Sequence, residues 1–440
     1  MVNSTEDFKY SLPKESSTNK RTGPLLGTEG ITSLNGARWR ATRKRFNPGF
    51  QPQYIQSLTQ PILAKVKIFV NRLQALADTG AVFRLEDFAR DLTFDVITQI
   101  AIAKDLAAQS TAEGQGVKSR FGLLTISRHL SKFIYGKGAT MGLDFFDLSR
   151  RAKVLFLEYV YDYNLTVIVE DCINSLDTST ATRSIIQLAA SDVPYSRRLV
   201  RNCMHQLKTF LFAGQDTTAT LISWLCYEMS KAAHEPRHAV FLKKLRDEHD
   251  DTFGPGSFSS LENFSDLVTT ASDSVTTSQL PYTTAFLKEA LRLHPPAATG
   301  RYVPEDATLK LSLPAHDIDI AGLQIYVNHY LIHRNPKIWG PDAHVFNPER
   351  WLDEGYVANL PPGAYRPFER GPRNCIGQEL AMLEALMVVS AVARGFEFEK
   401  VGLTGRLNAD GVVEREVWSN LAVTSVPVDG MVMRVRTAGT

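Results

Sequence analysis

The stretch FERGPRNCIG, from Phe368 to Gly377, directly precedes a long apolar segment, QELAMLEALMVVSAVARGF. Cys375 therefore lies where a helix is predicted to begin, and the free backbone N–H groups and the dipole of a helix start favour a negatively charged sulfur. Gly371 and Gly377 let the backbone approach a bulky partner closely, and Arg373 adds a positive charge. The loop predicts a thiolate metal ligand or a reactive thiol. The alternative is a capped helix start with an incidental cysteine.

Composition narrows the class of protein. The 440 residues are 44% hydrophobic and 22% charged, which is ordinary for a globular chain with a large core. The net charge of +2 gives no reason to expect a nucleic-acid partner. The widely spaced cysteines fit neither a disulfide framework nor a paired zinc motif, so a reducing compartment is expected. The N-terminus has no apolar run, which predicts neither a signal peptide nor a membrane-spanning anchor.

The hydrophobic pattern changes once along the chain. Before Pro296, apolar residues recur at intervals of three and four, which predicts long helices. Beyond it, ATLKLSL, HDIDIAG and LQIYVNHYLIH alternate like strands, and VTSVPVDGMVMRVR predicts a hairpin that turns near Asp429 and Gly430. SDLVTTASDSVTTSQL, at 265–280, is interpreted as a loop or a poor helix. We therefore expect a mainly α protein with small β-sheets.

No linker, internal repeat or low-complexity block divides the sequence. One large domain is therefore expected over residues 36–440, after a polar, irregular N-terminal segment at 1–35. Within the domain, the helical part is expected at about 36–296. The small sheets and the cysteine loop are expected at about 297–440.

A second motif, FLFAGQDTTAT, lies in the middle of a long predicted helix. Ala213 and Gly214 are small, and Gly214 weakens the helix locally. The hydroxyl of Thr217 can bond the carbonyl of Ala213 one turn earlier and distort the helix. Asp216 and Thr217, an acid beside a hydroxyl, could pass protons to a ligand bound nearby. The alternative is an ordinary polar helix face.

Further pairs of residues occur at helical spacing. Glu289 and Arg292 are three positions apart and face the same way, although most such pairs are surface ion pairs. They are followed by LHPP and later by FNPERW, which contains Arg350. Near the N-terminus, WRATR places Trp39 and Arg43 four positions apart on one helical face.

The order and spacing of these motifs resemble the cytochrome P450 family, most of all its microsomal type from fungi and other eukaryotes. The pattern Phe368-x-x-Gly371-x-Arg373-x-Cys375-x-Gly377 is similar to the haem-binding loop of that family. The resemblance implies the cytochrome P450 fold and haem b, with Cys375 as the axial thiolate ligand of the iron. Thiolate ligation favours O–O cleavage.

The resemblance also implies roles for the other motifs. Thr217 and Asp216 would deliver protons, while Ala213 and Gly214 would open space above the iron. Haem carries two propionate carboxylates, and a buried site needs hydrogen-bond donors for them. The residues that match the family's propionate anchors are Trp39, Arg43, Arg301 and Arg373. A buried structural network would join Glu289, Arg292 and Arg350. The pocket positions implied by resemblance are Phe210, Ala297, Ala298, Thr299 and the stretch near Leu421.

The function implied is a haem-thiolate monooxygenase that inserts one oxygen atom from O₂ into a lipophilic small molecule such as a polyketide, terpenoid, sterol or fatty acid. Electrons would come from NADPH through a separate reductase, plausibly in fungal secondary-metabolite biosynthesis. A member of the family could instead desaturate, couple or rearrange its substrate. Arg38, Arg40, Lys44 and Arg45 form a basic helix face that is either a docking surface for an acidic electron donor or an ordinary solvated face.

The family places such chains at the endoplasmic reticulum membrane surface, and a cytoplasmic location is the alternative for this sequence. Only 38 residues precede Trp39, so we expect the anchor and the first strands of the main sheet to be missing. An unpaired sheet edge and an open pocket would follow. The competing hypotheses are a truncated, non-catalytic haem protein or pseudoenzyme of the same family, and a haem-free binding module.

Overall fold

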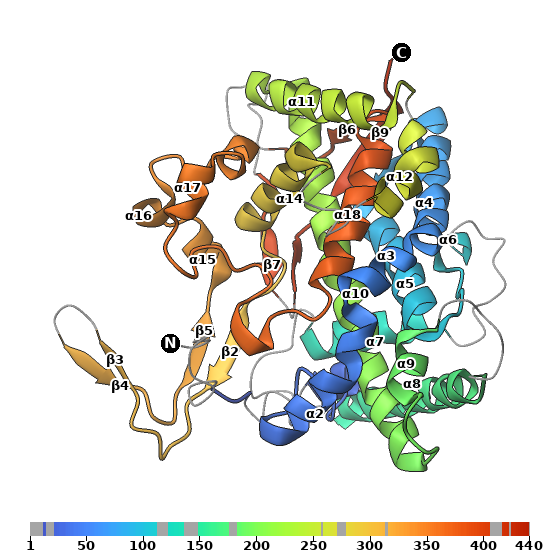
Figure 1. Cartoon of the computed structure of the whole chain (residues 1–440), viewed down its shortest axis with the longest axis vertical. Coiled ribbons are helices and arrows are strands. Elements are labelled where there is room, and N and C mark those ends of the chain that lie inside the picture. Colours follow the sequence, from blue (N-terminus) through green and yellow to red (C-terminus); the bar gives the residue numbers. More distant parts are fainter. Residues whose placement is uncertain are drawn as a thin grey trace.

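The computed structural model describes residues 12–14, 22–111, 122–135, 148–175, 183–256, 258–270, 279–312, 316–404, 416–421 and 424–439. Helices dominate the fold, and small antiparallel sheets lie around them (Figure 1). The expected fold class, mainly α with small β-sheets, is confirmed.

The longest helix, α10 (Arg197–Ser230), runs through the middle of the molecule (Figure 1). Its start is capped by the hydroxyl of Ser196, which accepts the backbone N–H of Leu199. It packs most extensively on α5 (Leu85–Ile102), and it also contacts α8 (Leu148–Asn174), α14 (Pro281–Leu293) and α18 (Gln378–Val392). Because neighbours surround it on most sides, nearly all its side chains are buried and the helix forms the centre of the core.

The other helices surround this centre. In chain order they are α2 (Gly36–Phe46), α3 (Pro52–Ser57), α4 (Thr59–Thr79), α6 (Ala108–Thr111), α7 (Leu123–Tyr135), α9 (Ile185–Ala190), α11 (Pro236–Phe253), α12 (Ser259–Thr270), α15 (His329–His333), α16 (Pro336–Trp339) and α17 (Glu354–Ala358). Short 3₁₀ turns occur at Asn47–Phe50, Lys231–Ala233, Pro348–Trp351 and Gly371–Arg373. In the described ranges, no helix is long and apolar enough to cross a membrane.

The strands pair in small antiparallel sheets. One sheet has the order β1 (Val82–Arg84), β9 (Val432–Thr437), β6 (Phe396–Lys400). The two-stranded pairs are β2 (Thr299–Tyr302) with β5 (Gln324–Val327), β3 (Lys310–Ser312) with β4 (Asp317–Asp319), and β7 (Ser419–Leu421) with β8 (Ser425–Pro427). In the β2–β5 pair, Arg301 lies opposite Ile325.

The structure corrects two predictions of local structure and decides part of a third. The predicted C-terminal hairpin does not form, because β8 pairs with β7 while β9 pairs with β1 and β6. The turn at Gly430 (φ +71°) therefore joins two different sheets. The strand predicted to run to His333 ends at β5, because the side chain of Asn328 caps α15 by accepting the N–H of Leu331. Of the segment interpreted as a loop or a poor helix, residues 265–270 are helical and belong to α12, and 271–278 lie outside the described residues.

Candidate functional site

A cavity of about 320 Å³ lies against the middle of α10, the start of α18 and strand β2. It brings together residues that the sequence places hundreds of positions apart. The predicted site residues that line it are Trp39, Arg43, Phe210, Ala213, Gly214, Thr217, Ala297, Ala298, Thr299, Arg301, Phe368, Arg373, Cys375 and Gly377. Asp216 is not among the lining residues, and the predicted stretch near Leu421 cannot be placed, because the Leu421 side chain and residues 422–423 lie outside what the structure describes.

The loop that carries Cys375 is held from two sides. Its own backbone closes it, since the N–H of Cys375 donates to the carbonyl of Phe368 at 2.8 Å. Gly371 has φ +74°, a left-handed conformation that favours glycine. From α2, Arg43 donates to the backbone carbonyl of Asn374 at 2.8 Å and to its side-chain oxygen at 3.1 Å. Arg43 thus binds the cysteine loop directly, a contact that the sequence pattern did not predict.

Cys375 combines burial within the protein with access to the cavity. Protein atoms surround the residue, yet its side chain is exposed, because it opens onto the cavity. Burial raises the pKa of the thiol, against the opposing effects of the Gly377 N–H and of Arg43. The Gly377 N–H at the helix start acts in the predicted direction, but burial outweighs it for the unligated thiol, and the choice between a thiolate metal ligand and a reactive thiol stays a prediction. A bound metal ion deprotonates a coordinating thiol outright, so the site fits a metal-bound thiolate better.

The opposite wall of the cavity is the middle of α10. The hydroxyl of Thr217 donates to the carbonyl of Ala213 at 2.7 Å, which confirms the predicted bond. Packing requires a glycine at position 214, which the sequence did not reveal. A Cβ at this position would lie 2.9 Å from Cγ1 of Ile97, so glycine lets α5 approach α10 closely.

Asp216 faces away from the cavity and toward α5. Its Oδ1 lies 2.6 Å from Nη2 of Arg90, which also contacts Glu86 at 2.8 Å, and the hydroxyl of Thr424 donates to its Oδ2. Burial, with the charge of Asp216 as a smaller cause, raises the pKa of Glu86 to about 7. The expected role of Asp216 and Thr217 in proton delivery stays a prediction, and the structure shows that the two side chains do not share the cavity. Consecutive residues of a helix point in different directions, and of these two only Thr217 lines the cavity.

A cationic rim borders another part of the cavity; we use this name for Lys14, Arg301 and Arg373. Arg301 is buried on β2 with 2% exposure. Arg373 donates to the carbonyl of Leu34 at 2.9 Å, and its guanidinium lies 4.5 Å from the ring centroid of Trp39. Burial and the charge of Arg301 lower the pKa of Arg373 to about 10.

The acidic side chains on the cavity wall balance this rim only in part, and the charge of Glu369 acts on both Lys14 and Arg301. Glu369 already accepts Arg366 and His329, and these partners outweigh its burial and lower its pKa to about 2. Burial raises the pKa of Glu384 to about 8, so its carboxyl is neutral at pH 7. The cavity therefore has an excess of positive charge on one side and a thiol on another. This arrangement fits haem, which carries two carboxylates and an iron that binds thiolate.

Lys14 and Glu384 are among the lining residues that the sequence motifs did not predict. Glu384 lies on α18 with 3% exposure, and its Oε1 has no hydrogen-bond partner among the described residues. It is the only charged residue in LAMLEALMVV, and this lone acid in an apolar helix was a readable signal. Lys14 belongs to the segment predicted as irregular and outside the domain.

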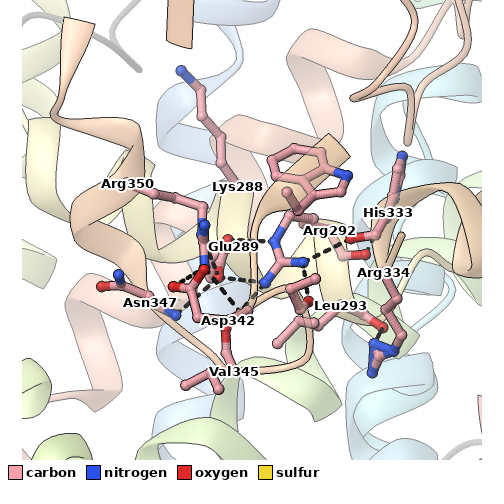
Figure 2. A network of polar contacts seen from close by, with 12 residues as sticks. Lys288, Glu289, Arg292, Leu293, His333, Arg334, Asp342, Val345, Asn347 and Arg350 are labelled. Carbon is pink, nitrogen blue, oxygen red and sulfur yellow. Dashed lines mark hydrogen bonds and ion pairs between the residues drawn. The ribbon is translucent and has the colours of Figure 1, made fainter. Parts of the chain in front are cut away.

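The predicted network beside α14 is present (Figure 2). The guanidinium of Arg292 donates to both carboxylate oxygens of Glu289, at 2.8 and 2.7 Å, and Nε of Arg350 donates to Oε1 at 3.1 Å. Trp351 and the backbone N–H of Asn347 donate to the same carboxylate, both within 2.9 Å. The network contacts the cavity through none of these groups, in keeping with a structural role.

Comparisons with known proteins agree on one family. A family model described as Cytochrome P450 matches residues 1–411. The cytochrome P450 monooxygenase acrF of Aspergillus aculeatus is 27% identical, and the match covers 97% of this chain and 88% of that protein. Cytochrome P450 monooxygenase polC of Polytolypa hystricis is 28% identical, with 88% and 68% covered. The crystal structure of the cytochrome P450 CYP102L1 has the same fold, with a TM-score of 0.75 at 21% identity over 96% of this chain and 88% of that one.

Proposed function

We infer that this chain, which belongs to the cytochrome P450 family and is a monooxygenase, inserts one oxygen atom from O₂ into a lipophilic small molecule with electrons derived from NADPH. The observation that carries this inference is the shared cavity. The thiol of Cys375, the hydroxyl of Thr217 and a set of cations open onto one space that is otherwise largely apolar.

The residues that would hold haem follow from the cavity wall. The sulfur of Cys375 would bind the iron, Phe368 and Gly377 would lie against the macrocycle, and Arg301 and Arg373 would bind the propionates. When bound, haem would supply the redox-active iron at which O₂ is reduced. Arg43 donates three N–H hydrogen bonds to Asn374 and Asn47, so we assign it to positioning the cysteine loop.

Two side chains of α10, those of Thr217 and Asp216, would take part in proton transfer. The hydroxyl hydrogen of Thr217 is committed to the Ala213 carbonyl, so its oxygen remains able to accept a hydrogen bond from a water or a substrate hydroxyl in the cavity. Asp216 would move protons from the α5 side, where Arg90 holds it and also contacts Glu86. Thr217 would then orient the proton donor inside the cavity, and Asp216 would resupply it.

The lining above the cysteine loop supports a lipophilic substrate. Its side chains are apolar or small, and they include Ile97, Phe210, Leu221, Ala297 and Ala298. Buried apolar surface selects ligands by shape and hydrophobic contact. Two relatives are fungal monooxygenases, which supports a proposed role in fungal secondary-metabolite biosynthesis. We further propose a separate NADPH-dependent reductase as electron donor and the endoplasmic reticulum surface as location.

The first test is the absorption spectrum of the reduced chain under carbon monoxide, for wild type and for Cys375→Ser. A strongly red-shifted Soret band in wild type that disappears in the variant supports ligation by Cys375. An unshifted band in wild type contradicts it.

Consumption of NADPH with reductase, O₂ and a panel of lipophilic substrates then tests turnover. Product that contains one labelled atom from ¹⁸O₂ supports the monooxygenase reaction. Haem binding without any NADPH consumption would instead support the competing non-catalytic haem protein.

A further inference from the structure

The described residues 12–14, part of the segment predicted to be irregular, pack directly on the site. The side chain of Leu12 is buried with Val303 and Ile320 in a small apolar cluster. The backbone N–H of Tyr302, the last residue of β2, donates to the carbonyl of Pro13 at 3.0 Å. One backbone hydrogen bond and the side chain of Leu12 therefore hold residues 12–14 against the end of β2.

Asn35 fixes the end of this stretch. Its side-chain oxygen accepts the backbone N–H of Lys14 at 2.9 Å, and its side-chain amide donates to the carbonyl of Lys14 at 3.0 Å. The same oxygen accepts a guanidinium N–H of Arg373 at 3.1 Å. One side chain thus connects residues 12–14 to the loop that carries Cys375.

These contacts place the ammonium group of Lys14 on the cavity wall beside two arginines. Its Nζ donates to the carbonyl of Gly300 at 3.1 Å, next to Arg301 on the same strand. Burial, then the charges of Arg301 and Arg373, lower the pKa of Lys14 to about 7, and Glu369 opposes them. His329 also lines this part of the cavity, but its Nε2 is hydrogen-bonded to the carboxylate of Glu369 at 3.0 Å. A carboxylate placed among the three cations would relieve their repulsion.

We propose that residues 12–14 form a strap of the cofactor site, in which Lys14 binds a haem propionate together with Arg301 and Arg373. This inference rests on the proposed haem-dependent function. The strap is held by β2 and Asn35, so that Lys14 reaches the carboxylate at little entropic cost. It gives the N-terminal segment a role in retaining the cofactor.

The test measures loss of haem from the loaded chain to excess apomyoglobin. Lys14→Gln keeps N–H donors but removes the charge, and we expect haem to leave about tenfold faster, the effect of one charge-assisted hydrogen bond. Lys14→Arg keeps the charge and should stay within about twofold of wild type. Lys243→Met, in an exposed pair with Asp247, is the matched control and should not change the rate.

A second readout is proton uptake when haem binds at pH 8. Wild type should take up close to one proton more than Lys14→Arg, because a lysine with a pKa of about 7 is mostly neutral at pH 8 and becomes charged beside the carboxylate, whereas arginine is charged throughout. This comparison uses a variant that retains haem, so it does not depend on the stability of Lys14→Gln.

The outcomes separate the two proposals. If wild type shows the red-shifted band but Lys14→Gln and Lys243→Met lose haem at the same rate, the role of Lys14 is overturned. Equal proton uptake in wild type and Lys14→Arg overturns it too. If wild type itself binds no haem, the proposed function fails, and the strap fails with it.

Discussion

Two regions of this molecule bury several charges, and they do so in opposite ways. Beside α14, Glu289 and Arg292 are both 0% exposed, and the carboxylate accepts N–H groups from every side (Figure 2). The arginine donates in addition to the backbone carbonyls of His333, Ala343 and Val345, all within 3.0 Å. In the cationic rim, by contrast, Lys14 and two arginines of like charge converge on a cavity.

The difference separates architecture from function. A buried ion pair with all its partners inside the protein fixes the relation between segments, here between α14 and the chain from His333 to Trp351. Like charges that converge without balance raise the free energy of the folded chain, and an anionic ligand offsets that cost. Burial of charge alone is therefore not a sign of a binding site. A binding site is indicated when the buried charges face a cavity rather than partners within the protein.

The largest effect is expected from breaking the saturated network. Arg292→Met leaves the carboxylate of Glu289 buried without its main counter-charge, so we expect the free energy of unfolding to fall by about 3–5 kcal/mol. Denaturant unfolding followed by circular dichroism measures this change. The matched control is Lys243→Met in the exposed pair with Asp247, which should change stability by less than about 0.5 kcal/mol. Similar losses in both variants would remove the distinction drawn above.

A pH effect is expected at Glu384, the buried acid of the cavity. Its pKa in the folded chain is about 8 against a usual 4.5, so between these values the folded chain binds one proton more than the unfolded chain. Stability then falls as pH rises from about 5 to about 8, and levels off above that. Glu384→Gln should remove this slope and stabilise the protein by a few kcal/mol at pH 8. Melting curves at several pH values test this, and parallel pH profiles for wild type and variant would refute it.

The sequence predicted what depends on periodicity and local spacing. The long helices α10 and α18 follow from their apolar repeats, and Glu289 with Arg292 follows from a three-residue spacing on α14. Glu384 carried a local signal that was not used, because a single acid within an apolar helix run must be buried, neutral or paired.

The rest depends on long-range pairing that no local pattern contains. Nothing in VTSVPVDGMVMRVR tells whether β8 pairs with β9 or with β7, since both choices satisfy the same alternation. Lys14 and its partner Gly300 are 286 positions apart, and the strap is visible only once β2 is in place. Likewise, the motif around Asp216 does not state which side of α10 faces α5.

A smaller effect should distinguish the two neighbours on α10. Thr217→Val removes the hydroxyl from the cavity at nearly constant volume, and product formed per NADPH should fall about tenfold, at the low end for loss of proton delivery. Asp216→Asn keeps a side-chain oxygen that can still accept hydrogen bonds but removes the carboxylate charge. It should slow turnover and change the solvent isotope effect while leaving haem binding intact. Haem content and the reduced carbon monoxide spectrum are the controls. An unchanged ratio of product to NADPH in Thr217→Val would show that the cavity hydroxyl has no part in proton transfer.

The smallest effect is expected from charges that face solvent. Arg40, Lys44 and Arg45 are exposed on α2, and an exposed basic face changes the rate of association more than affinity. Lys44→Glu should reduce the rate of electron transfer from the reductase a few-fold at low salt, and the difference should vanish at high salt because exposed charges are screened. The control is Lys243→Glu on α11, at the opposite end of the molecule from α2 (Figure 1), which makes the same change of net charge. If both variants slow the reaction equally, net charge alone is responsible and α2 is a solvated face, so these exposed cations would belong with neither the network nor the rim.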